Sequence, residues 1–97
     1  MQTVTLGTTG IVTPKNAFGA LPVQRVGMPD AKKLLRLAYD EGFTFFDTAR
    51  AYSDSEEKIG EALSDVRDRI YIATKTMATT VDKFWKDLET SLANLKT

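Results

Sequence analysis

The spacing of hydrophobic and polar positions changes several times along the chain, and each change predicts a new element. Polar and apolar residues alternate from Gln2 to Leu6, and a similar pattern resumes at residues 11–13 after the turn sequence GTTG. Two short strands around such a turn are typical of a β-hairpin. A short apolar stretch at residues 17–21 then predicts a buried strand, in which Gly19 indicates a close approach of another backbone.

Three amphipathic helices are predicted after this strand, and two more short apolar strands separate them. Helical spacing begins at residue 29, and Gly42 lies just past the predicted end of the first helix. An aromatic strand is expected over residues 43–46, an apolar strand over 70–74, and a last helix from residue 79 or 80. The positions that predict the three buried helix faces are Ala31, Leu34, Leu35 and Ala38, then Ile59, Ala62, Leu63 and Val66, and finally Val81, Phe84, Leu88, Leu92 and Leu95.

Charged and aromatic residues refine the picture of the last two helices. The second helix opens with Ser-Asp-Ser at residues 53–55, and Glu56 and Glu57 are expected to act as capping-box acceptors. The run from Glu56 to Lys58 is therefore interpreted as a helix start with a solvated face. Trp85 is expected to pack against a neighbouring helix or to cover a sheet edge.

The alternation of strands and helices after the hairpin predicts an α/β fold with a parallel sheet and right-handed crossovers. Residues 1–97 are expected to form a single small domain or a fragment of a larger one. The outer two strands of this sheet would have open edges unless further chain or another molecule pairs with them. Self-association into a homo-oligomer through these edges is one expectation.

Composition excludes several classes of function. The 13 basic and 13 acidic residues balance, so no net charge attracts nucleic acid or an anionic membrane surface. Without cysteine or histidine, the chain has no disulfide framework, no thiolate metal site and no histidine general base, and no metal site is expected. No apolar run reaches the length of a membrane span and the N-terminus lacks a signal-peptide pattern, so a cytoplasmic location is expected.

Three residues that can carry chemistry follow the last two predicted strands. Asp47 comes directly after the strand at 43–46, and Lys75 directly after the strand at 70–74. Ligands of parallel α/β folds bind beyond the carboxyl ends of the strands, where these two residues can meet as an ion pair. Tyr52 lies in the following turn and can fold over this pair. An ammonium beside a phenol favours the phenolate, which suits a proton donor that works near neutral pH.

A structural interpretation of the same three residues stays open at this point. Asp47 can cap backbone donors in a turn, Lys75 can be a solvated strand end, and Tyr52 can cover the site as an amphipathic side chain. The alternation of side chains along the two strands does not settle whether Asp47 and Lys75 point to the same interior.

A family resemblance favours the catalytic interpretation. The stretches LGTTGIVTPKNAFGALPVQR, AYDEGFTFFDTARAYSDSEEKIGEAL, IYIATK and DLETSLANL resemble, in order and separation, the N-terminal portion of the aldo-keto reductase family. Within them, DTARAYSDSEEKIGEAL is similar to the family signature, in which Asp, Thr, Ala, a Tyr and a Ser-Glu pair precede a glycine-containing helix. The resemblance is strongest to the bacterial branch whose members can carry a C-terminal iron–sulfur tail, which this sequence lacks.

The resemblance implies that the chain forms the N-terminal hairpin and three β/α units of a (β/α)8 TIM barrel. It also implies an oxidoreductase that uses NADPH to reduce an aldehyde or a ketone. The family's catalytic aspartate, tyrosine and lysine correspond to Asp47, Tyr52 and Lys75. Its cofactor-binding positions correspond to Gly19, Ala20 and Asp47, although Ala20 stands where threonine is commoner.

The chain also departs from the family pattern. The family's fourth catalytic residue is a histidine after the fourth strand, and its cofactor phosphates are bound by loops after the seventh and eighth strands; neither is present in residues 1–97. A truncated chain of this length is therefore expected to be inactive by itself and to need the remainder of the barrel. The alternatives are a non-catalytic subunit that senses the cofactor and a truncated fragment that self-associates.

Overall fold

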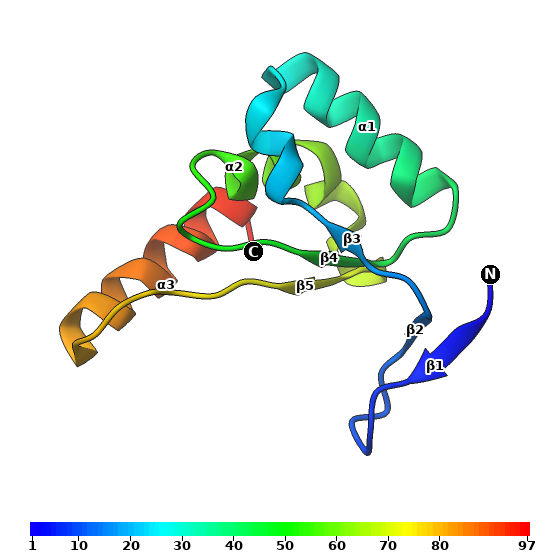
Figure 1. The fold of residues 1–97 in the computed structure, drawn as a ribbon, viewed down its shortest axis with the longest axis horizontal. Helices are drawn as coiled ribbons and strands as arrows, with labels where there is room; N and C mark the ends of the chain where they lie inside the picture. The colour runs from blue at the N-terminus through cyan, green and yellow to red at the C-terminus, as the bar shows by residue number, and fades with distance from the viewer.

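The computed structural model describes residues 1–97, and a small parallel sheet with helices packed on one face lies at its centre (Figure 1). The predicted order of hairpin, strands and helices is confirmed. Most strands are shorter than expected, and Asp47 is the last residue of its strand rather than the residue after it. In chain order the elements are β1 (Thr3–Thr5), β2 (Val12–Pro14), β3 (Phe18–Gly19), the 3-10 helix η1 (Leu21–Arg25), α1 (Met28–Asp40), β4 (Phe45–Asp47), α2 (Ser55–Leu63), the 3-10 helix η2 (Ser64–Arg69), β5 (Tyr71–Ala73) and α3 (Val81–Leu95).

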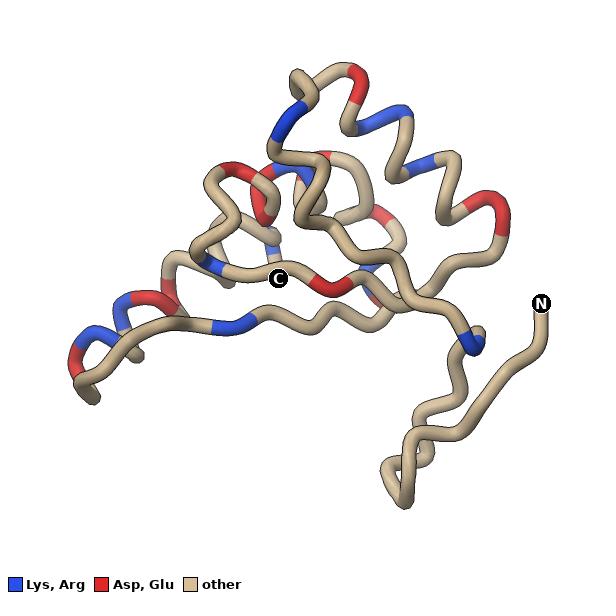
Figure 2. Tube along the Cα trace, in the orientation of Figure 1, with Lys and Arg blue, Asp and Glu red and all other residues tan.

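The N-terminal hairpin stands apart from the helices (Figure 1). β1 and β2 pair antiparallel, with Thr3 opposite Pro14. Gly7 and Gly10 take φ values of +53° and +78° in the turn, a region where side chains with a Cβ are strained. Figure 2 shows that the hairpin carries no charged residue, whereas charges are frequent along the helices and loops.

The central sheet has the order β3-β4-β5 and all its strands are parallel. α1 connects β3 to β4, and α2 with η2 connects β4 to β5, as expected for β-α-β units. Gly19 pairs with Asp47, and Asp47 pairs with Ala73, so the carboxyl ends of the three strands lie in one row.

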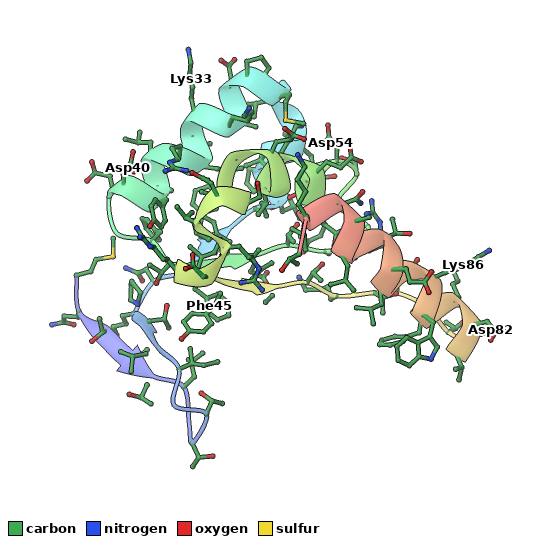
Figure 3. All side chains as sticks on the ribbon, turned by 180° about the vertical axis from the view of Figure 1, so that it is seen from behind. Lys33, Asp40, Phe45, Asp54, Asp82 and Lys86 are labelled. Atoms are coloured by element: carbon green, nitrogen blue, oxygen red, sulfur yellow. The ribbon has the colours of Figure 1, made fainter.

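The two faces of the sheet differ completely in burial. Phe46 is fully buried on the face covered by the helices, where its ring lies 5.6 Å from that of Phe18. Phe45 lies on the opposite face (Figure 3), with its ring 6.4 Å from that of Tyr71, which is 38% exposed. The core therefore lies on the helix side, and its members are Ala20, Val23, Ala31, Leu35, Ala38, Phe46, Ile59, Ala62, Leu63, Val66, Ile70 and Leu95.

Local sequence signals place the helix ends. Proline occupies the first turn of α1, and Gly42, with φ +109°, follows its last turn. Thr80 caps α3, since its hydroxyl accepts a hydrogen bond from the backbone N–H of Lys83. No helix in the structure combines the length and the apolar character needed to cross a membrane.

Several sequence-based expectations about packing are wrong. Four residues of the predicted buried helix faces are exposed by 44%, 73%, 44% and 43%: Leu34, Val81, Phe84 and Leu92. Trp85 is 56% exposed and stacks edge-on against the half-exposed Phe84, because no element covers the N-terminal half of α3. α3 is buried only at Ser91 and Leu95, near its other end. A Cβ on Gly19 would meet no atom within 4 Å, so no other backbone lies closely against the side of this glycine where a side chain would project.

Candidate active site

The row of strand ends brings Asp47 and Lys75 to one side of the sheet. Asp47 is paired in register with Ala73, and Lys75 follows Ala73 by two positions. Side chains alternate along a strand, so all three point to the face opposite Phe46. The register thus answers the question of orientation that periodicity left open.

The expected ion pair between Asp47 and Lys75 is present. Lys75 Nζ lies 3.3 Å from Asp47 Oδ2 and also donates to the backbone oxygen of Thr48, at 2.6 Å. The side chains of Lys75 and Asp47 are 51% and 44% exposed, and a pair this accessible contributes at most about 1 kcal/mol to folding. The pair therefore stabilises the fold little and leaves both groups accessible from solvent.

Tyr52 lies over the same lysine. It belongs to the loop between β4 and α2, and Lys75 Nζ is 5.0 Å from the centroid of its ring. Backbone hydrogen bonds extend the β4–β5 pairing into this loop, since the N–H of Thr48 donates to Ala73 O at 2.8 Å and that of Arg50 to Lys75 O at 2.9 Å. Asp47, Tyr52 and Lys75 thus converge at the carboxyl ends of β4 and β5.

The last part of the Tyr52 loop is held by polar contacts with η1 and α2. Ser53 has a φ of +39°, which is unusual for a residue with a side chain, and its hydroxyl donates to Gln24 Oε1 at 2.9 Å. Lys58 Nζ donates to Asp54 Oδ1 at 2.8 Å and to Val23 O at 3.0 Å. The hydrogen bond from Lys58 holds the pKa of Asp54 below its ordinary value.

The two other predicted cofactor positions lie at the end of β3 and just beyond it. The backbone of Gly19 faces open space, which leaves room for a flat ring beside it. Ala20 is fully buried; its N–H donates to Asp47 O at 2.8 Å, and its carbonyl accepts from the hydroxyl of Ser55 at 3.1 Å. The side chain of Ala20 is therefore not accessible to a bound molecule.

Sequence reasoning misplaced the charged run at the start of α2. Glu56 and Lys58 are 0% and 2% exposed rather than solvated. The side chain of Asp54, the N-cap residue of α2, accepts no capping hydrogen bond from a backbone N–H, so there is no capping box. Glu56 instead binds Arg50, Thr74 and Asn94. The helical spacing could have indicated that Glu56 is buried, because Glu56 lies on the same helix face as Ile59 and Leu63.

A sequence profile described as the aldo/keto reductase family matches residues 4–97. The chain belongs to this family. A relative named probable aldo-keto reductase 1 from Glycine max is 36% identical over 86 residues, which cover 77% of this chain and 24% of the relative.

Solved structures of the family share the fold. A putative aldo-keto reductase from Pseudomonas aeruginosa superposes with a TM-score of 0.86 at 29% identity, over 98% of this chain and 42% of the other. An aldo/keto reductase from Klebsiella pneumoniae, solved in complex with NADP and acetate, gives 0.82 at 26% identity, over 91% of this chain and 33% of the other.

The fold of this aldo-keto reductase chain is therefore the hairpin and three β/α units of a partial TIM barrel, as predicted. The chain spans only about a quarter of the curated relative and less than half of the solved chains. The exposed face that carries Phe45 and Tyr71 corresponds to the interior of such a barrel, because the helices cover the other face.

Proposed function

We propose that this chain supplies the catalytic tyrosine, lysine and aspartate for NADPH-dependent reduction of an aldehyde or ketone. The observation that carries the proposal is the convergence of Asp47, Tyr52 and Lys75, with the lysine ammonium 3.3 Å from the carboxylate and 5.0 Å from the phenol ring. These three groups lie at the carboxyl ends of parallel strands, where active sites of (β/α)8 barrels form.

Each of the three side chains has a distinct part in this proposal. Tyr52 donates its phenolic proton to the substrate oxygen as a hydride is added to the carbonyl carbon, so that the two together give the alcohol and tyrosine becomes a phenolate. The ammonium of Lys75, 5.0 Å from the centre of the Tyr52 ring, offsets the negative charge that the oxygen of Tyr52 carries after proton transfer. Asp47 holds the ammonium in place through their ion pair.

The open space beside Gly19 and the accessible carboxylate of Asp47 fit a nicotinamide ring with its amide group. NADPH, when bound, supplies the hydride for the carbonyl carbon and is oxidised to NADP⁺. Gly19 provides an unobstructed backbone and Asp47 a hydrogen-bond acceptor, whereas Ala20 shapes the loop from the core. A complex with NADP among the structural relatives supports this cofactor class.

A chimera tests the proposal, because the chain spans less than half of its solved relatives. Residues 1–97 replace the matching part of the Pseudomonas aeruginosa reductase, and NADPH oxidation is followed with a reactive aromatic aldehyde. Loss of the positioned acid in Tyr52→Phe should lower kcat by about 10²–10⁴-fold. NADPH binding, measured by fluorescence, should remain, because the hydroxyl acts only on the substrate.

Tyr71→Phe is the matched control, since Tyr71 lies on β5 outside the proposed triad. A Tyr52→Phe chimera with unchanged kcat would refute the assignment of the proton donor. NADPH binding without turnover in the unmutated chimera would instead favour a cofactor-sensing subunit. Residues 1–97 alone are expected to show no turnover, because they cover less than half of the solved reductase and so form only part of a barrel.

A further inference from the structure

Glu56 is a fully buried carboxylate outside the proposed catalytic triad. It lies in the first turn of α2 and has an exposed fraction of 0%, whereas the next residue, Glu57, is exposed. Burying a charge is unfavourable by several kcal/mol, in order of magnitude, unless partners compensate for it. Its partners therefore indicate what this carboxylate does.

Both oxygens of Glu56 are occupied by groups from three different segments. Oε1 accepts a hydrogen bond from the guanidinium of Arg50 and a longer one, at 3.4 Å, from the side-chain amide of Asn94 on α3. Oε2 accepts from the hydroxyl of Thr74 at 2.8 Å. The carboxylate thus joins the loop after β4, the end of β5 and α3.

Two of these partners flank the proposed site. Arg50 also donates to the carbonyl of Ser53, at 3.0 Å, so its guanidinium spans the segment that contains Tyr52. Thr74 immediately precedes Lys75. Glu56 therefore links the loop that bears the tyrosine to the strand end that bears the lysine, without touching either residue.

Stability alone is a weak reason for such an arrangement. A buried ion pair often stabilises a fold no better than apolar residues of the same volume, whereas it can specify one geometry. We propose that Glu56 is a positioning residue that sets the placement of Tyr52 relative to Lys75. The catalytic meaning of that placement rests on the proposed function, but the placement itself can be measured separately.

The test is an NMR measurement on the 97-residue chain. Through-space transfer between the ring protons of Tyr52 and the side-chain protons of Lys75 is compared in the unmutated chain, Glu56→Met and Thr74→Val. Methionine keeps the length of the side chain but accepts none of the three hydrogen bonds, whereas valine at position 74 removes only the bond to the strand end. Glu57→Met is the matched control on the exposed neighbouring position.

Each of the first two variants should weaken the Tyr52–Lys75 signal by about threefold or more, which corresponds to a displacement of roughly 1 Å when the signal falls with the sixth power of distance. Glu57→Met should leave the signal unchanged. Signals from the buried Leu35 on α1 should keep their positions in all variants, because the displacement is local.

An unchanged Tyr52–Lys75 signal in folded Glu56→Met overturns the proposal, as does its absence from the unmutated chain. If Glu56→Met does not fold, Thr74→Val decides in the same way, because Thr74 is exposed and its methyl replacement keeps the shape. Unfolding of both variants also overturns it, since the contact would then serve stability. None of these results depends on turnover, so they are distinct from failure of the proposed reduction.

Discussion

Gly60 lies where α2 passes closest to the end of α3, and its replacement by alanine tests this helix packing. A Cβ at this position would lie 2.1 Å from the backbone oxygen of Asn94 and 3.1 Å from the backbone of Leu95. Both obstructing groups are backbone, so no side-chain rotation relieves the clash. The last turn of α3 must therefore move back by about 1 Å before the methyl group fits.

One stabilising and two destabilising terms set the size of the effect. Alanine favours a helix over glycine by about 1 kcal/mol, which would stabilise α2. Moving α3 weakens the burial of Leu95, now 3% exposed, and full burial of a leucine contributes about 1.5–3 kcal/mol. Overpacking of a close contact itself costs about 1–3 kcal/mol. The net expectation is a loss of about 1–3 kcal/mol.

Urea denaturation followed by far-UV circular dichroism measures this loss, and Trp85 fluorescence reports on α3 in the same samples. In thermal unfolding the loss corresponds to a Tm lower by roughly 5–20 °C for a domain of this size. Gly19→Ala is the matched control, since its Cβ would meet no atom and its stability should change by less than about 0.5 kcal/mol. A Gly60→Ala chain as stable as the unmutated one would refute the close contact between α2 and α3.

Two further predictions concern the core and the response to acid. Phe46→Ala should destabilise the chain by about 3–5 kcal/mol in urea denaturation, because the ring is fully buried, and a loss no larger than that of the half-exposed Phe84→Ala would contradict the described core. Hydrogen bonds from Lys58 and Lys96 lower the pKa of Asp54 and Glu61. These hydrogen bonds contribute to stability at neutral pH, where both carboxyl groups are ionised. The contribution is lost as the pH falls below the ordinary pKa values, which are about 4.5 for Glu61 and 3.8 for Asp54. Because both carboxylates are accessible to solvent, the loss of stability should be small and should be reduced further by salt. Glu61→Gln should make the stability depend less on pH. A urea midpoint that rises on acidification would contradict the assignment.

The candidate triad could largely be located from the sequence, because its members lie at or after the ends of strands that can be recognised from short apolar runs. Asp47 and Lys75 come after short apolar runs, and parallel strands bring their carboxyl ends together. The family signature added Tyr52. The relative orientation of the three side chains required the register, in which Asp47 pairs with Ala73.

Glu56 and Trp85 show where local patterns fail. Glu56 lies in a charged run that is typical of a solvated helix start, yet Arg50, Thr74 and Asn94 from other segments enclose it. Trp85 has a large apolar side chain of the kind usually buried, but it remains 56% exposed because no element lies against that part of α3. In both cases burial is set by the neighbours of the residue in space rather than by its neighbours in the chain.

By itself, the sequence determined the order of the elements, the end of α1, the start of α3 and the family of the chain. These properties depend on periodicity, capping residues and glycines with positive φ, all of which act within a few residues. Only the tertiary structure decided which face of the sheet holds the core, and which polar groups join the Tyr52 loop to the end of β5. Those outcomes depend on strand register and on contacts between segments distant in the chain, which local patterns do not encode.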